Sequence, residues 1–190
     1  TDPMQLRSIS AECAEVSVPE SDAEGSRRIT LSVARIPAIN RRKQTDPIVL
    51  LAGGPGQGAQ LSFTAVSTVF SRTGRQRDIV LLDQRGTGRS NMLSCVTESR
   101  STAETFASDT ATFVKLNEKC LEKLRSTSDL GAYTTSHAVR DLDAVRALLG
   151  YEKLNFYAAS YGTRVAQHYA RRYPERVRSM VLDGVVAPET

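Results

Sequence analysis

The segment at 158–162, Ala-Ala-Ser-Tyr-Gly, constrains this chain more than any other. It stands between a short apolar run, residues 154–157, that predicts a buried strand, and a stretch with helical spacing that ends at Pro174. A serine at such a strand-to-helix corner, with small residues two positions before and after it, has the form of a nucleophile elbow. Ala158 takes the place of the usual first glycine. The alternative interpretation is a small-residue turn that contains a serine by chance.

Two more apolar runs upstream each end in a glycine-rich loop. Residues 47–52 lead into Gly-Gly-Pro-Gly-Gln-Gly at 53–58, and residues 78–82 lead into Asp-Gln-Arg-Gly-Thr-Gly-Arg-Ser at 83–90. Because the carboxyl ends of parallel strands meet at one edge of a sheet, the sequence predicts that these loops surround a common site with the serine. A glycine-rich loop also lets backbone N–H groups approach the oxygen that becomes negative during acyl transfer.

A phosphate-binding loop is the competing interpretation of these glycines. Such a loop requires lysine and then serine or threonine directly after its last glycine, and neither segment has this pattern. The stretch Gly88-Arg89-Ser90 comes closest, but Asp83 stands where the first glycine should be. The sequence therefore disfavours nucleotide binding.

The three segments, taken in order, resemble the α/β-hydrolase fold. More narrowly, they resemble the tripeptidyl aminopeptidase and proline iminopeptidase group of serine peptidases, from about Cys13 to Ala187. The resemblance implies an α/β fold with a mostly parallel, doubly wound sheet. It also implies that Ser160 is the nucleophile and that the amides of Gly54 and Tyr161 form the oxyanion hole. It does not separate a peptidase from a carboxylesterase.

The hydrophobic pattern predicts the remaining elements. Alternating residues at 14–19 and 29–35 predict an antiparallel N-terminal hairpin. We expect parallel strands at 47–52, 78–82, 153–158 and 177–183, and helices near 60–70, 102–125 and 136–149. We interpret residues 1–4 as a cloning remnant before a mature start. Residues 5–190 are then expected to form the N-terminal part of a hydrolase core, up to the lid insertion.

A serine hydrolase of this fold also needs an acid and a histidine, which follow the serine in the chain. After Ser160 the chain has one histidine, His168, about two helical turns along the predicted helix and out of reach of the serine. His137 precedes the serine and is interpreted as a residue of a helix cap. Asp183 is a possible acid, although a turn-capping role is favoured. We therefore expect the acid and histidine in a C-terminal remainder, present as a second chain or as a missing fragment.

The cysteines bear on where the protein works. By the resemblance, Cys95 and Cys120 are expected to form a disulfide in an exported, periplasmic or extracellular protein whose leader has been removed. The alternative is a pair of reduced cysteines in a cytosolic protein. Cys13 has no expected partner within the chain. The sequence has no Cys-x-x-Cys and no His-x-x-x-His spacing, so we expect no metal site and no cofactor.

Charge and hydropathy exclude two other classes of partner. The net charge is +4, but the arginines are scattered rather than gathered with aromatic residues on one face, so nucleic acid is not an expected partner. No apolar run approaches the roughly 18 residues of a transmembrane helix, so a membrane is not expected either.

Three functional hypotheses follow. The favoured one is a serine hydrolase that removes short peptides or single residues from peptide N-termini, and its neighbour is a carboxylesterase of the same fold. The third is a non-catalytic half-fold that keeps the elbow and lacks the base. An aminopeptidase must also hold a free α-ammonium. No acidic residue of the chain stands out for this task, so we expect the necessary carboxylates in a lid outside it.

Overall fold

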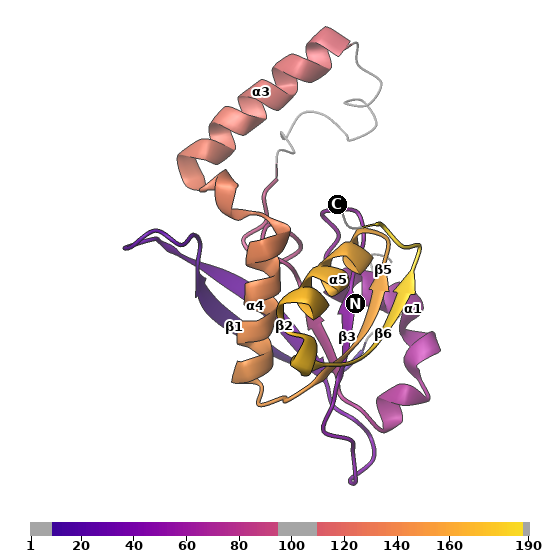
Figure 1. The fold of residues 1–190 in the computed structure, drawn as a ribbon. Helices are drawn as coiled ribbons and strands as arrows, with labels where there is room; N and C mark the ends of the chain where they lie inside the picture. Colours follow the sequence, from indigo (N-terminus) through magenta and orange to yellow (C-terminus); the bar gives the residue numbers. More distant parts are fainter. Residues whose placement is uncertain (1–8, 95–109, 188–190) are drawn as a thin grey trace.

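The centre of the fold is a six-stranded mixed sheet with the strand order β1-β2-β4-β3-β5-β6 (Figure 1). The computed structural model describes residues 9–94 and 110–187. The strands are β1 (Glu12–Pro19), β2 (Arg28–Ile36), β3 (Ile48–Leu51), β4 (Ile79–Leu82), β5 (Leu154–Ala159) and β6 (Val177–Asp183). The pairs β1–β2 and β2–β4 are antiparallel, whereas β4, β3, β5 and β6 run parallel.

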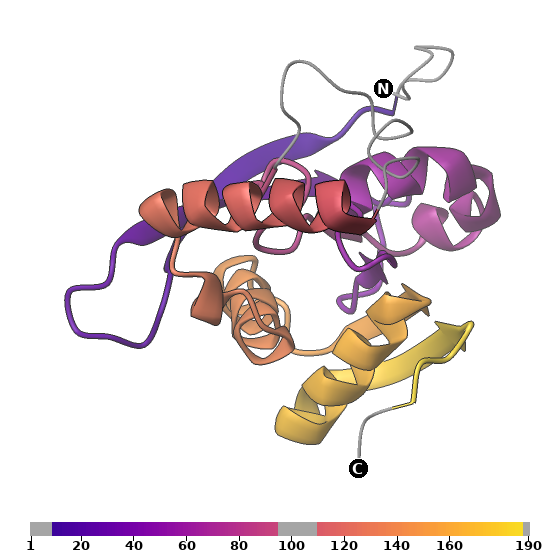
Figure 2. The ribbon, with the colours of Figure 1, turned by 90° about the horizontal axis from the view of Figure 1, so that it is seen from above.

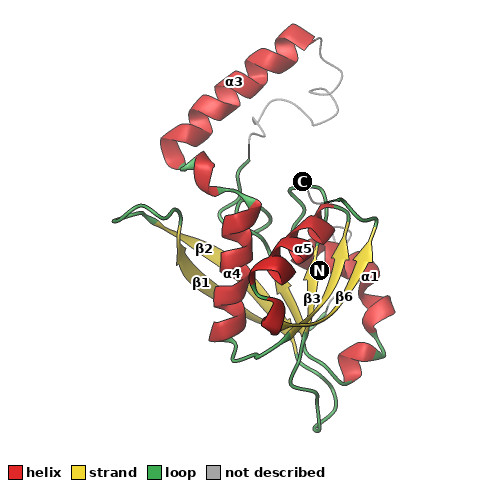
Figure 3. Ribbon diagram, in the orientation of Figure 1, coloured by secondary structure: helices red, strands yellow, loops and turns green. Residues whose placement is uncertain are grey.

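Helices cover both faces of this sheet, as the view from above shows (Figure 2). Helix α1 (Ala59–Val66) lies on one face, and α4 (Thr135–Leu148) and α5 (Tyr161–Arg172) lie on the other. Helix α3 (Thr110–Thr127) has no buried residue and projects beyond the edge where the parallel strands end (Figure 3). Short 3-10 turns complete the described elements: η1 (Ser67–Phe70), η2 (Thr73–Arg75), η3 (Leu130–Ala132) and η4 (Pro174–Arg176). None of the described helices is long and apolar enough to cross a membrane.

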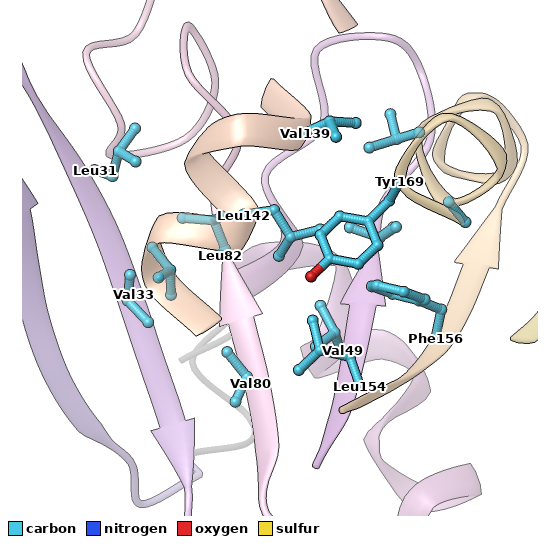
Figure 4. Close-up of a cluster of buried hydrophobic side chains, with 14 of the residues drawn as sticks. Leu31, Val33, Val49, Val80, Leu82, Val139, Leu142, Leu154, Phe156 and Tyr169 are labelled. Carbon is cyan, nitrogen blue, oxygen red and sulfur yellow. The ribbon is translucent and has the colours of Figure 1, made fainter. Parts of the chain in front are cut away.

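The sheet has a hydrophobic core on each face. All residues of β3 and β4 are buried, as expected for central parallel strands that are covered on both sides. The larger core lies between the sheet and the helices α4 and α5, where the Tyr169 ring packs edge-on against Phe156 with 5.1 Å between ring centroids (Figure 4). The smaller core includes Phe63 and Phe70 and lies on the α1 face.

The fold class predicted from the sequence is confirmed, and the expected elements are present with small shifts of their ends. The expected helix at 60–70 is α1 followed by the turn η1. The helix expected from 102 corresponds to α3, which begins at Thr110 in the described part of the chain; positions 102–109 lie outside the described residues.

The order of the strands determines where a site can form. Strand β3 lies between β4 and β5, so the chain leaves β3 toward one side of the sheet and later returns to its other side. Such a switch point opens a crevice at the carboxyl ends of the strands, where open α/β sheets bind their ligands. The glycine-rich loop after β3 and the serine after β5 therefore lie next to each other.

Candidate active site

Ser160 occupies the corner between β5 and α5. Its backbone has φ 49° and ψ −122°, and the residue is exposed. A non-glycine residue with positive φ is held in a sparsely populated conformation, at a cost of about 1–3 kcal/mol, and such strain gathers at functional sites. The strand-to-helix turn predicted from the sequence is confirmed.

The small residues around Ser160 are explained by close backbone packing. A Cβ atom on Gly162 would lie 2.3 Å from the carbonyl oxygen of Leu51, so α5 begins almost in contact with the end of β3. A Cβ atom on Gly53 would lie 3.0 Å from the Ser160 Cβ. The glycine-rich loop after β3 is therefore in contact with the serine. Ala158 is fully buried, so a much larger residue could not replace it.

Hydrogen bonds hold the corner from both sides. The Ser160 N–H donates to the Asp183 carbonyl at 2.8 Å, which joins the end of β5 to the end of β6. The Ser160 carbonyl accepts from the Thr163 N–H at 2.9 Å and from the Thr163 hydroxyl at 2.6 Å. The same hydroxyl oxygen accepts from the Val186 N–H at 2.9 Å. The strained residue is thus fixed by its own helix and by the segment that follows β6.

The two predicted oxyanion donors are each one residue from the contact with Ser160 or from Ser160 itself. Gly54 has φ +103° and follows Gly53, the residue that contacts the serine. Tyr161 is the first residue of α5, and the first amides of a helix have no partner within it, so they remain available to a ligand. The Tyr161 hydroxyl lies 2.8 Å from the Thr135 hydroxyl, which anchors this side chain to α4. The donor roles themselves stay predictions.

Asp83, which directly follows β4, connects the two glycine-rich loops. It is 2% exposed, and its Oδ1 accepts from the Gln60 N–H at 3.0 Å while its Oδ2 accepts from the Arg89 N–H at 3.0 Å. Gln60 belongs to the first turn of α1, whose N-cap residue, Gly58, makes no side-chain cap. The Asp83 carboxylate, which comes from the loop after β4, therefore caps the N-terminus of α1. In this way it stabilises the end of the loop that carries Gly54.

A buried ion pair that no local sequence pattern predicts supports the loop after β4. The Arg85 guanidinium binds both carboxylate oxygens of Asp141 on α4, at 2.7 and 2.8 Å, and also donates to the carbonyls of Glu20 and Ala132. Burial raises the pKa of Asp141, although the adjacent Arg85 charge acts in the opposite direction. A bidentate pair with further hydrogen bonds is the arrangement in which buried charges are tolerated. It attaches the loop to α4 and to the end of β1.

Neither histidine of the chain is placed to activate Ser160. His168 lies eight residues along α5, about 12 Å from the serine along the helix axis. His137 lies at the start of α4, where its N–H donates to the hydroxyl of the N-cap Thr134, as predicted for a cap residue. Burial lowers the pKa of His137, and its ring lies 3.8 Å from Asp22 rather than beside the serine.

The expected turn-capping role of Asp183 is wrong. Its carboxylate accepts from the Tyr157 hydroxyl at 2.9 Å, and its main-chain carbonyl, not its side chain, accepts from Ser160. Tyr157 reaches this position because β5 and β6 are parallel and Tyr157 lies two residues before Ala159, the register partner of Asp183. Asp183 is therefore an exposed residue at the edge of the sheet that carries the nucleophile.

A small pocket opens between the loop after β3 and the start of α5. Its volume is about 90 Å³. Its lining comes from the loops after β3 and β4 and from the starts of α4 and α5: Pro55, Gly56, Gln84, Arg85, Thr87, Tyr133, Thr134, Ala138 and Tyr161. The pocket thus lies at the carboxyl edge of the sheet, beside the residue that follows Ser160.

Two of the three cysteines, Cys13 and Cys120, lie within the described residues. Cys95 lies outside the described residues, whereas Cys120 lies on α3, so the disulfide between them stays a prediction. Cys13 is a free, exposed thiol on β1. Within residues 9–94 and 110–187, no three histidine, cysteine, aspartate or glutamate side chains are grouped so that they could hold a metal ion.

Comparison with known proteins agrees with this geometry. The model of the alpha/beta hydrolase fold family matches residues 46–190. The chain belongs to the α/β-hydrolase family. It is 34% identical over 193 residues to a tripeptidyl aminopeptidase of Streptomyces coelicolor. That alignment covers 93% of this chain and 35% of the relative. The serine protease Hip1 of Mycobacterium tuberculosis is 31% identical to this chain, and the alignment covers 93% of this chain and 36% of Hip1.

Among solved structures, a proline iminopeptidase-related protein of Thermus thermophilus superposes on this α/β-hydrolase chain with a TM-score of 0.53. The sequence identity is 19%, and 90% of this chain and 44% of that chain are covered, so the comparison supports the fold alone. The chain spans about a third of the length of the curated relatives that it matches. Together the relatives indicate a peptidase-like hydrolase, in agreement with the resemblance inferred from the sequence.

Proposed function

We propose that this chain carries the nucleophile of a serine hydrolase, an aminopeptidase that releases short peptides or single residues from peptide N-termini through an acyl-enzyme on Ser160. The observation that carries the proposal is the exposed serine at positive φ, with a glycine-rich loop in contact with it. The named relatives support the peptidase branch, since a tripeptidyl aminopeptidase and a serine protease are among them.

The proposed reaction has two steps. The Ser160 hydroxyl oxygen attacks the scissile carbonyl and transfers its proton to a histidine, while the amides of Tyr161 and Gly54 donate to the oxygen that becomes negative. The C–N bond then breaks, the amine leaves with that proton, and the acyl group remains on Ser160. Water hydrolyses the ester in the second step, which releases the N-terminal fragment and restores the serine.

We propose that the histidine and the acid come from a C-terminal remainder, which also provides the lid, as a second chain or a further fragment. The edge strand β6 supports this proposal, because Met180 and Val181 are exposed there and Val185 is exposed just after it. An exposed, apolar edge strand is a surface that natural proteins normally cover. We call this chain together with its remainder the assembled enzyme.

The discriminating experiment compares a peptide substrate that has a free N-terminus with the same peptide after N-acetylation. The assembled enzyme should lose most of its kcat/KM on acetylation, because the contacts to the ammonium disappear and the groups that bind it are left unpaired. Small activated esters serve as a control for a competent nucleophile, because both a peptidase and an esterase hydrolyse them. Rapid ester turnover without cleavage of either peptide would make the protein a carboxylesterase.

We also propose that the protein is exported and that Cys95 and Cys120 form a disulfide. The bridge would stabilise the fold by about 3 kcal/mol through loop closure. Peptide mapping of native protein without reductant should show the two cysteine peptides joined, and reduction should separate them. Cys13, which is free and exposed, is the internal control and should react with iodoacetamide in both samples. Alkylation of Cys95 and Cys120 before reduction would contradict both the bridge and the export.

A further inference from the structure

Three strands of the sheet end in a carboxylate at the edge that carries Ser160. Glu20 directly follows β1, Asp83 directly follows β4, and Asp183 is the last residue of β6. The strands themselves therefore place these three carboxylates at the active-site edge. Their surroundings differ, and the difference identifies one of them as a group that can bind a cation.

Glu20 and Asp83 are already occupied. Glu20 is 2% exposed, accepts two bonds from the Arg27 guanidinium, at 2.5 and 2.6 Å, and a third from the Tyr133 hydroxyl at 2.8 Å. Asp83 is also buried, and its two oxygens accept from the backbone amides of α1 and of its own loop. Neither carboxylate can take up a ligand without losing these bonds.

Asp183 has no such partners in the described part of the chain. It is exposed, and its Oδ2 accepts one bond, 2.9 Å long, from the neutral hydroxyl of Tyr157. The bond to Asp183 raises the pKa of Tyr157, so this hydroxyl remains a donor at neutral pH. No lysine, arginine or histidine within residues 9–94 and 110–187 forms an ion pair with this carboxylate. Among the described residues, Tyr157 orients this carboxylate and no cationic side chain neutralises it.

The position of Asp183 relative to the nucleophile is fixed by the backbone. Its carbonyl accepts the Ser160 N–H at 2.8 Å, and Ala159, the residue before the nucleophile, is its register partner on β5. Neighbouring strands lie about 4.8 Å apart, so the backbone of Asp183 is less than a tripeptide length from the backbone of the serine. This separation suits a charge at the N-terminus of a short peptide whose carbonyl reacts at Ser160.

We infer that Asp183 binds the α-ammonium group of the peptide substrate. The inference rests on the proposed function and replaces the expectation that every ammonium-binding carboxylate lies in the lid. A primary ammonium fits this carboxylate better than a metal ion does, because the described residues do not group it with two further histidine, cysteine, aspartate or glutamate ligands. A charge-assisted hydrogen bond between the two groups would set the preference for free N-termini.

The test uses Asp183→Asn in the assembled enzyme. Asparagine keeps the main-chain carbonyl that holds Ser160, and it removes only the charge. The kcat/KM for peptides with a free N-terminus should fall about ten- to a hundredfold. The N-acetylated peptides and small esters should be hydrolysed as before, and a fluorophosphonate should label Ser160 at the wild-type rate.

A pH profile adds an independent measurement. The α-amino group of a peptide loses its proton near pH 8, so the wild-type kcat/KM for free peptides should fall above that pH. Asp183→Asn should flatten this decrease, because the variant no longer distinguishes the ammonium from the neutral amine. Glu152→Gln is the matched control: it removes an exposed carboxylate just before β5, at the opposite edge of the sheet, and should change neither measurement.

The possible outcomes separate this inference from the proposed function. If the wild-type enzyme does not distinguish free from acetylated peptides, the aminopeptidase proposal fails, and this inference fails with it. If the wild type distinguishes them and Asp183→Asn does so equally well, only the inference is overturned. An equal loss on free, acetylated and ester substrates would also overturn it, because Asp183 would then act on the reaction centre itself, for example as the acid that orients the histidine.

Discussion

Ser160→Ala is expected to lower kcat of the assembled enzyme by about 10⁶, with little change in KM. The alanine removes the oxygen that attacks the carbonyl, so the covalent route closes, whereas the oxyanion amides and the rest of the site continue to bind substrate. The fold should be kept, because the hydrogen bonds described at this corner involve the Ser160 backbone and not its hydroxyl.

A fluorophosphonate provides the direct measurement for this prediction. The reagent should add its mass to Ser160 in the wild type and should leave Ser160→Ala unlabelled. Ser179→Ala is the matched control, because Ser179 is another exposed serine, on β6, whose hydroxyl donates to Asn155 at 2.6 Å. That variant should label and turn over normally. Near-normal turnover by Ser160→Ala would contradict the assignment, and an unreactive wild type would favour the non-catalytic half-fold.

Gly54→Ala is expected to lower kcat by about 10²–10³, which is the effect of losing one oxyanion donor. Gly54 has φ +103°, and a Cβ atom there would lie 2.8 Å from the Gly56 amide nitrogen. The loop must therefore rearrange to accept alanine, and the Gly54 N–H moves away from the oxygen that it should stabilise. The expected result is a lower kcat at nearly unchanged KM, because the lost contact forms mainly in the transition state.

Gly150→Ala separates this effect from simple backbone strain. Gly150 has φ +75°, and a Cβ atom there would have no neighbouring atom within 4 Å. Alanine at this position therefore has the unfavourable backbone conformation, which costs about 1–2 kcal/mol, without the collision. We expect it to lower the unfolding temperature and to leave kcat unchanged. If Gly54→Ala also lost only thermal stability and turned over normally below its unfolding temperature, the loop would be structural and not part of the oxyanion hole.

The sequence by itself was sufficient for the features that depend on neighbours along the chain. The apolar runs that became β3 and β4 are buried on both faces, and this burial selects uninterrupted hydrophobic residues. The corner at Ser160 was also predictable, because a strand that turns directly into a helix needs small residues at fixed positions beside the nucleophile. Local steric and hydrophobic constraints leave a regular pattern in the sequence.

The tertiary structure decided the interactions that join distant segments. Arg85 and Asp141 are 56 residues apart, and nothing in their local sequence marks them as a buried pair. Asp183 was expected to cap a turn, yet the register between β5 and β6 brings Tyr157 to its carboxylate and leaves the residue exposed at the edge that carries the nucleophile. Such contacts depend on the order and register of strands, which fix the neighbours of a side chain only after the whole sheet has formed.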